Sequence, residues 1–182
     1  KPNMIDAVTD KVPAIHEVHL HHGVWLNGRH DDPDAIGTPF MAAGEEKTVS
    51  STPPGYGYRV KPTDEWLLNY MIHNQTAQHY NVVITYQLKW INRAPALAQG
   101  IKDVVPLWFD EVGGFYPVYN PTNTGPEVKT DSLDPTKTVH VRRRSFSVNR
   151  DMEIVWMAGH VHPGGLRLDV KQQRCGGQNK AP

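Results

Sequence analysis

The sequence predicts an all-β protein, specifically a jelly-roll-like antiparallel β-sandwich. Residues 81–91 alternate strictly between apolar or aromatic and mixed positions, which is typical of a half-buried strand. Fifteen glycines and fifteen prolines separate further short alternating segments. No segment keeps a 3.6-residue period, so residues 95–101 are expected to form one short helical turn at most.

Seven strands are expected along the chain, each from its own alternation. Turn signals lie between them, including Pro53-Pro54-Gly55 and Pro163-Gly164-Gly165. Residues 120–135 are rich in Pro, Thr, Asn and Asp, which indicates a long excursion between strands rather than a domain linker. The expected strands are 18–26, 56–60, 66–73, 81–91, 139–148, 154–162 and 166–170.

The length and the even distribution of these strands favour one domain. A chain of 182 residues can bury one substantial core and is short for two. We therefore expect a single β-sandwich domain over 1–182, with 1–14 and 171–182 as extended or mobile ends.

Charge and hydropathy exclude some partners. The chain has 19 Lys and Arg against 19 Asp and Glu, so no net charge attracts nucleic acid. No stretch approaches the roughly 20 apolar residues of a transmembrane helix. A small-molecule substrate, a reductant or a protein partner remains compatible with this composition, and the oligomeric state is left open.

Three local features bear on processing. The chain starts at Lys1 rather than Met, which favours a mature processed protein or a trimmed chain. The single Cys175 cannot form an internal disulfide and lies in a polar tail. Asn74-Gln75-Thr76 matches the N-glycosylation pattern, which is weak evidence by itself.

Histidine placement is the strongest functional signal. His19, His21 and His22 lie in HLHH, and His160 and His162 lie in HVH. Residues i and i+2 of a strand share a face, so each HxH pair can present two imidazoles to one metal ion. His22 joins its neighbours only if the strand ends or bulges, and Gly23 directly after it favours such a distortion.

Other residues extend this candidate metal site. His73 ends the segment 66–73 on the face opposite its more apolar side chains. Met71 and Met157 accompany the histidines, although core packing is the alternative explanation for both. Glu45 and Glu46 are candidate acceptors for imidazole N–H groups, or simply exposed turn carboxylates.

The donor types favour copper, with zinc as the alternative. No Cys pair accompanies the histidines, which argues against a structural zinc finger. A facial iron site needs a carboxylate, and neither HxH pair is followed closely by Glu. No nucleophile elbow, phosphate-binding glycine loop or HExxH helix is present, so no catalytic residue is assigned.

Several strings in the chain resemble bacterial members of the stress up-regulated nodulin family. They are HLHHGVWLN (19–27), GEEKT (44–48), PPGYGYRVKPTDEWLLNYMIHNQT (53–76) and AGHVHPGG (158–165). The resemblance runs from about residue 16 to about residue 170. Together with the non-Met start, it implies an extracytoplasmic location, secreted or periplasmic.

A more distant likeness is to the copper type II, ascorbate-dependent monooxygenases of the peptidylglycine hydroxylating type. On that likeness, His21 and His22 match the His-His pair of one copper centre and His73 its third histidine. His160 and His162 match the HxH pair of the other centre. Those enzymes divide two coppers between two jelly-roll domains and also use a Met ligand, whereas one domain holds every motif here.

The resulting expectation is a copper-binding extracytoplasmic β-sandwich with a histidine-rich site, monooxygenase-like in redox character or holding copper only. Two alternatives stay open: a structural or accessory binding module with a non-catalytic metal, and a zinc-dependent hydrolase. The expected metal ligands are His21, His22, His73, His160 and His162, with His19, Met71 and Met157 as further candidates.

Overall fold

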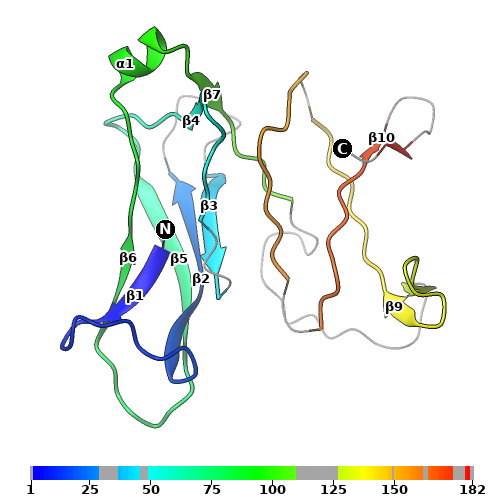
Figure 1. Cartoon of the computed structure of the whole chain (residues 1–182), viewed down its shortest axis with the longest axis horizontal. Helices are drawn as coiled ribbons and strands as arrows, with labels where there is room; N and C mark the ends of the chain where they lie inside the picture. Colours follow the sequence, from blue (N-terminus) through cyan, green and yellow to red (C-terminus); the bar gives the residue numbers. More distant parts are fainter. Residues whose placement is uncertain are drawn as a thin grey trace. The chain divides into compact units, whose positions relative to one another are not determined.

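The computed structural model of the chain describes residues 2–28, 37–45, 49–109, 127–148, 150–161, 164–173 and 179–180. These residues form mostly β-strands in antiparallel sheets, with almost no helix, in agreement with the all-β prediction. The jelly-roll strand order stays a prediction. The elements, labelled in Figure 1 where there is room, are β1 (Pro2–Asp6), β2 (Val18–Asn27), β3 (Pro39–Gly44), β4 (Tyr56–Tyr58), β5 (Trp66–Asn74), β6 (Val82–Tyr86), α1 (Arg93–Ala98), β7 (Lys102–Val104), β8 (Val128–Thr130), β9 (Thr138–His140), β10 (Gln172–Gln173) and β11 (Asn179–Lys180).

The backbone divides into two compact units. The first comprises Lys1–Pro106 and Ile154–Pro182, and the second comprises Leu107–Glu153. The second unit contains the antiparallel pair of β8 and β9. All strands that concern the candidate site belong to the first unit, and the expectation of a single domain stays a prediction.

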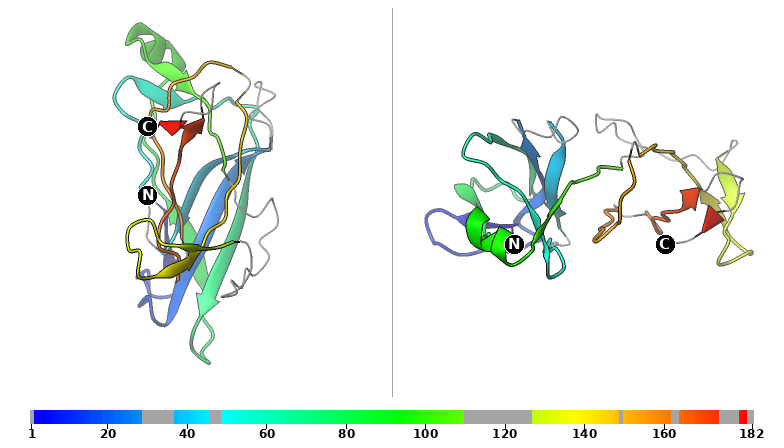
Figure 2. Two further views of the ribbon diagram at one scale, coloured as in Figure 1. Left: turned by 90° about the vertical axis from the view of Figure 1, so that its right-hand side faces the viewer. Right: turned by 90° about the horizontal axis from the view of Figure 1, so that it is seen from above.

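The central sheet of the first unit has the order β3-β2-β5, with both pairings antiparallel. Figures 1 and 2 show the blue β2 between the cyan β3 and the green β5. A second antiparallel pair, β1 with β6, supplies side chains to the same core. That core consists of Met4, Val18 and Leu20, against which Ile72, Tyr80, Val82 and Ile84 pack.

This core fixes which face of β2 is apolar. Val18 and Leu20 are buried in it, so the alternating residues His19 and His21 project from the opposite face. On β5, Ile72 contacts the core and His73 therefore faces away from it. Strand alternation thus places three imidazoles on one face of the sheet.

Trp25 is buried near the C-terminal end of β2. Its side chain is almost completely buried, and its ring meets Tyr86 of β6 edge-on with 5.5 Å between centroids. A Cβ atom at Gly23 would lie only 3.2 Å from the Trp25 ring. Gly23 therefore provides space for this ring.

Several expected elements agree closely with the structure and others do not. The segments expected at 18–26 and 66–73 are β2 and β5, and the expected helical turn overlaps α1. The segment expected at 81–91 is a strand only over β6, because the ladder with β1 ends at Tyr86. The described residues of 154–162 and 166–170 form no strand, since their backbone lacks ladder partners there.

The one helix among the described residues is short. It ends before Gly100, whose φ of 68° is the left-handed conformation common after a helix. No described helix has the length and apolar character that crossing a bilayer requires.

Candidate metal centre

A β-bulge in β2 shapes the site. His19 lies directly opposite His73 in the antiparallel ladder with β5, whereas His22 lies opposite Met71. The register shifts between Leu20 and His22, which makes His21 the inserted residue. The bulge brings the His21 ring over the His73 ring in a stacked arrangement, with 4.0 Å between centroids and 16° between planes.

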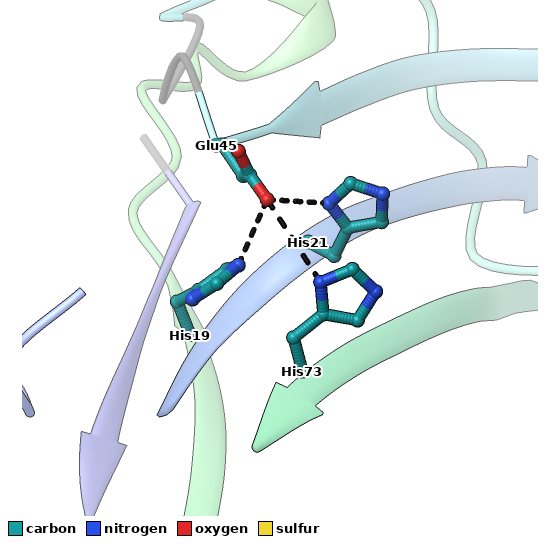
Figure 3. Close-up of side chains that lie close together, drawn as sticks. All are labelled: His19, His21, Glu45 and His73. Atoms are coloured by element: carbon teal, nitrogen blue, oxygen red, sulfur yellow. Dashed lines mark hydrogen bonds and ion pairs between the residues drawn. The ribbon is translucent and has the colours of Figure 1, made fainter. Parts of the chain in front are cut away.

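The end of β3 supplies a carboxylate to these rings. Gly44, the last residue of β3, pairs with His22, and Glu45 follows it directly. Glu45 Oε1 lies within hydrogen-bond distance of His19 Nε2, at 2.8 Å, and of His21 Nδ1, at 2.6 Å. His73 Nδ1 lies 4.0 Å from the same oxygen. Figure 3 shows the four side chains converging from β2, β5 and the end of β3.

These four residues form a compact donor set. Each of His19, His21, Glu45 and His73 offers one ligand atom, and these atoms all lie within 4.8 Å of one another. Donors around a tetrahedral metal ion with bonds of about 2.0–2.1 Å lie roughly 3.3 Å apart. The three distances from Glu45 Oε1 to the imidazoles lie on both sides of that value. The cluster therefore has the donor types of a metal site, gathered closely enough that they could hold one ion.

Burial differs between the two sides of the cluster. The side chains of His19 and His21 are only 9% and 11% exposed, whereas those of His73 and Glu45 are 40% and 41% exposed. The β2 imidazoles are thus held inside the protein. The β5 imidazole and the carboxylate leave the other side open to solvent.

A hydrogen bond to the backbone also holds the His19 ring. Its Nδ1 donates to the backbone carbonyl of Ile15 at 2.5 Å, which leaves Nε2 directed at Glu45. Histidines that bind metals almost always donate their second ring N–H to a carbonyl or carboxylate, and this contact fixes the tautomer and the ring orientation. Ile15 therefore orients His19 as a metal ligand requires.

Two pKa shifts favour the forms of the side chains that bind metals. Hydrogen bonds from His21 and His19 lower the pKa of the Glu45 carboxyl below its ordinary value. Partial burial lowers the pKa of His73, and positive charge on His21 or His19 lowers it further. An ionised carboxylate and a neutral imidazole are the forms that coordinate a cation.

The lowered pKa of His73 makes the stability of the metal-free protein depend on pH. As pH falls below the ordinary value of 6.5, His73 becomes protonated in the unfolded chain before it does in the folded chain. The free energy of unfolding therefore decreases. We expect urea unfolding with a chelator present to show a larger loss between about pH 7.5 and about pH 5.5 for the natural chain than for His73→Gln. Equal losses in the two proteins would contradict this assignment.

Of the other predicted ligands, His22 and His160 do not belong to the four-residue cluster. The His22 ring lies 4.5 Å from the His21 ring and 6.0 Å from that of His160, which is exposed. Met71 and Met157 are 43% and 50% exposed. His162, Glu46 and Cys175 lie outside the described residues. The assignment of His22, His160, His162, Met71 and Met157 as ligands stays a prediction.

Glu45 was expected from the sequence only as an acceptor for imidazole N–H groups or as an exposed turn carboxylate, and not as a metal ligand. It lies 24 residues after His21, and only the pairing of β3 with β2 brings it to the imidazoles. The sequence signal was its position in the turn after an apolar segment, together with its proposed role as an acceptor for imidazole N–H groups.

Comparison with known proteins adds no assignment: no family model matches the chain, and no curated protein or solved structure is significantly similar to it. The resemblances to the nodulin family and to the copper monooxygenases stay predictions.

Proposed function

We propose that this protein binds one divalent transition-metal ion, with copper as the preferred metal, through His19 Nε2, His21 Nδ1, His73 Nδ1 and Glu45 Oε1. The observation that supports the proposal is the convergence of one ligand atom from each of these four residues within 4.8 Å. Strands β2 and β5 and the residue directly after β3 contribute them, so folding assembles the site.

The hydrogen bonds of His19 favour a cation at this position. Both of its ring nitrogens face acceptors, the Ile15 carbonyl and the Glu45 carboxylate. A neutral imidazole carries only one N–H, so without a metal this arrangement requires an extra proton on the ring or on the carboxylate. A metal ion between Nε2 and Oε1 satisfies both atoms without that proton.

The donor set favours copper over softer or harder metal ions. Three imidazoles and one carboxylate suit divalent copper, zinc or iron, and no thiolate is among the four. Glu45 supplies the carboxylate that the sequence near the HxH pairs lacks, so iron is not disfavoured by ligand type. Among these ions, divalent copper binds a given nitrogen and oxygen site most tightly.

Solvent access supports a redox-active role for the copper ion. Glu45 and His73 leave one side of the cluster open, where a fifth ligand can approach the metal. A second candidate function is a structural metal site, because four protein donors already complete a tetrahedral shell. A zinc hydrolase also needs an open position for the attacking water, which in this four-donor set only the exposed side of the cluster would supply.

Elemental analysis combined with electron paramagnetic resonance separates these roles. The protein is purified from cells supplied with both copper and zinc and measured before and after ascorbate. We expect about one equivalent of copper, with nitrogen hyperfine structure from imidazoles that disappears on reduction. About one equivalent of zinc would support the structural or hydrolase role instead. Absence of bound metal, and no uptake on titration, would refute the proposal.

A further inference from the structure

Met71 lies beside the exposed side of the four-residue cluster. On β5, Ile72 contacts the core, so Met71 and His73 project together from the opposite face. Residues two apart on a strand are separated by only about 6.5–7 Å. The bulge in β2 places Met71 directly opposite His22, whose ring lies 4.5 Å from that of His21. Met71 is therefore a neighbour of the cluster both along its own strand and across the sheet.

This side of the sheet gives solvent access to Met71 as well as to the cluster. Met71 is 43% exposed, close to the 40% exposure of the His73 side chain. Small molecules that approach the metal ion past His73 therefore also pass Met71. The thioether of methionine is soft and polarisable, and oxidation to the sulfoxide is its common reaction.

Copper that ascorbate reduces would supply the oxidant at this position. In two one-electron steps, ascorbate gives up two electrons and two protons and becomes dehydroascorbate, while dioxygen becomes hydrogen peroxide. Peroxide then transfers one oxygen atom to a thioether: the S–O bond forms, the O–O bond breaks, and the other oxygen leaves as water. Because this peroxide is produced at the metal, its concentration is highest at side chains beside the cluster.

We infer that Met71 is the oxidation site of this protein when its copper ion turns over with dioxygen and an ene-diol reductant such as ascorbate. Methionine sulfoxide forms at this position ahead of other, equally exposed methionines. The inference rests on the proposed copper site. It adds a modification site to the exposed side of the cluster, and methionine sulfoxide reductases can reverse such a modification.

Mass spectrometry of proteolytic peptides tests the inference, with Met152 and Met157 as internal controls. These two residues are 40% and 50% exposed and do not lie on the sheet that carries the cluster. Protein loaded with one equivalent of copper is given ascorbate in air, and catalase removes peroxide that diffuses into solution. We expect Met71 to gain one oxygen atom at least about tenfold faster than either control. Copper-free protein treated with hydrogen peroxide should oxidise all three methionines at comparable rates.

The variant His73→Ala should lose most of its bound copper and, with it, the preference for Met71. Equal oxidation of the three methionines in the copper-loaded natural chain would overturn the inference while leaving the metal site intact. A preference for Met71 that persists in copper-free protein would overturn it as well, and so would oxidation of the cluster imidazoles with Met71 unmodified. Failure to bind copper would refute the proposed metal site, and the inference with it.

Discussion

Replacement of His73 by Ala is expected to weaken copper binding by at least about 100-fold. Loss of groups that merely orient a metal ligand typically costs 10- to 100-fold, and His73 is itself a proposed ligand. Its side chain is 40% exposed, so truncation removes the imidazole without creating a large internal cavity. Competition titration against a chelator of known affinity measures the change.

Two other histidine variants serve as controls for this result. His79→Ala removes an exposed imidazole six residues away along the chain, and His160→Ala removes one from the HVH pair. Neither residue belongs to the four-donor cluster, so both variants should retain the copper affinity of the natural chain. A large loss in His160→Ala, with none in His73→Ala, would move the site to the residues that the monooxygenase likeness implies.

Replacement of Trp25 by Ala is expected to lower the free energy of unfolding by about 3–5 kcal/mol. Trp25 is 1% exposed, and truncation removes both its apolar burial and its ring contact with Tyr86. A loss of this size is a large part of the 5–15 kcal/mol that typically stabilises a domain. Urea unfolding of the metal-free protein at constant pH gives the value.

Trp90 provides the control for this substitution. It is 79% exposed, so Trp90→Ala should change the free energy of unfolding by no more than about 0.5 kcal/mol. If the two tryptophan variants were equally stable, Trp25 would not be packed against Tyr86 of β6 as described.

Alternation in the sequence predicts the strands whose two faces differ, because burial on one side imposes a period of two. β5 therefore agrees closely with expectation, and so does β2, which is buried on both faces but alternates apolar and polar residues over Val18–His21. β1 and β3 were not anticipated: Pro39-Phe-Met-Ala-Ala-Gly44 does not alternate, and β1 contains Asn3 and Asp6 between apolar residues. Their strand character comes from pairing with β6 and β2, which depends on long-range contacts.

The candidate site was predictable only where its residues are close in sequence or lie on an alternating strand. His19 and His21 share a face by spacing, and His73 was placed on the less apolar face of its own strand. The bulge at His21 was not predictable in position, since Gly23 was the expected distortion and instead makes room for Trp25. Glu45 reaches the cluster through strand pairing, which no local pattern records.

The most direct test of the proposed centre is a crystal structure of copper-loaded protein with anomalous diffraction data collected at the copper absorption edge. We predict one strong anomalous peak at roughly 2.0–2.2 Å from His19 Nε2, His21 Nδ1, His73 Nδ1 and Glu45 Oε1. A peak at His22 and His160 instead, with the His19–Glu45 hydrogen bond retained, would contradict the assignment of the metal to this cluster.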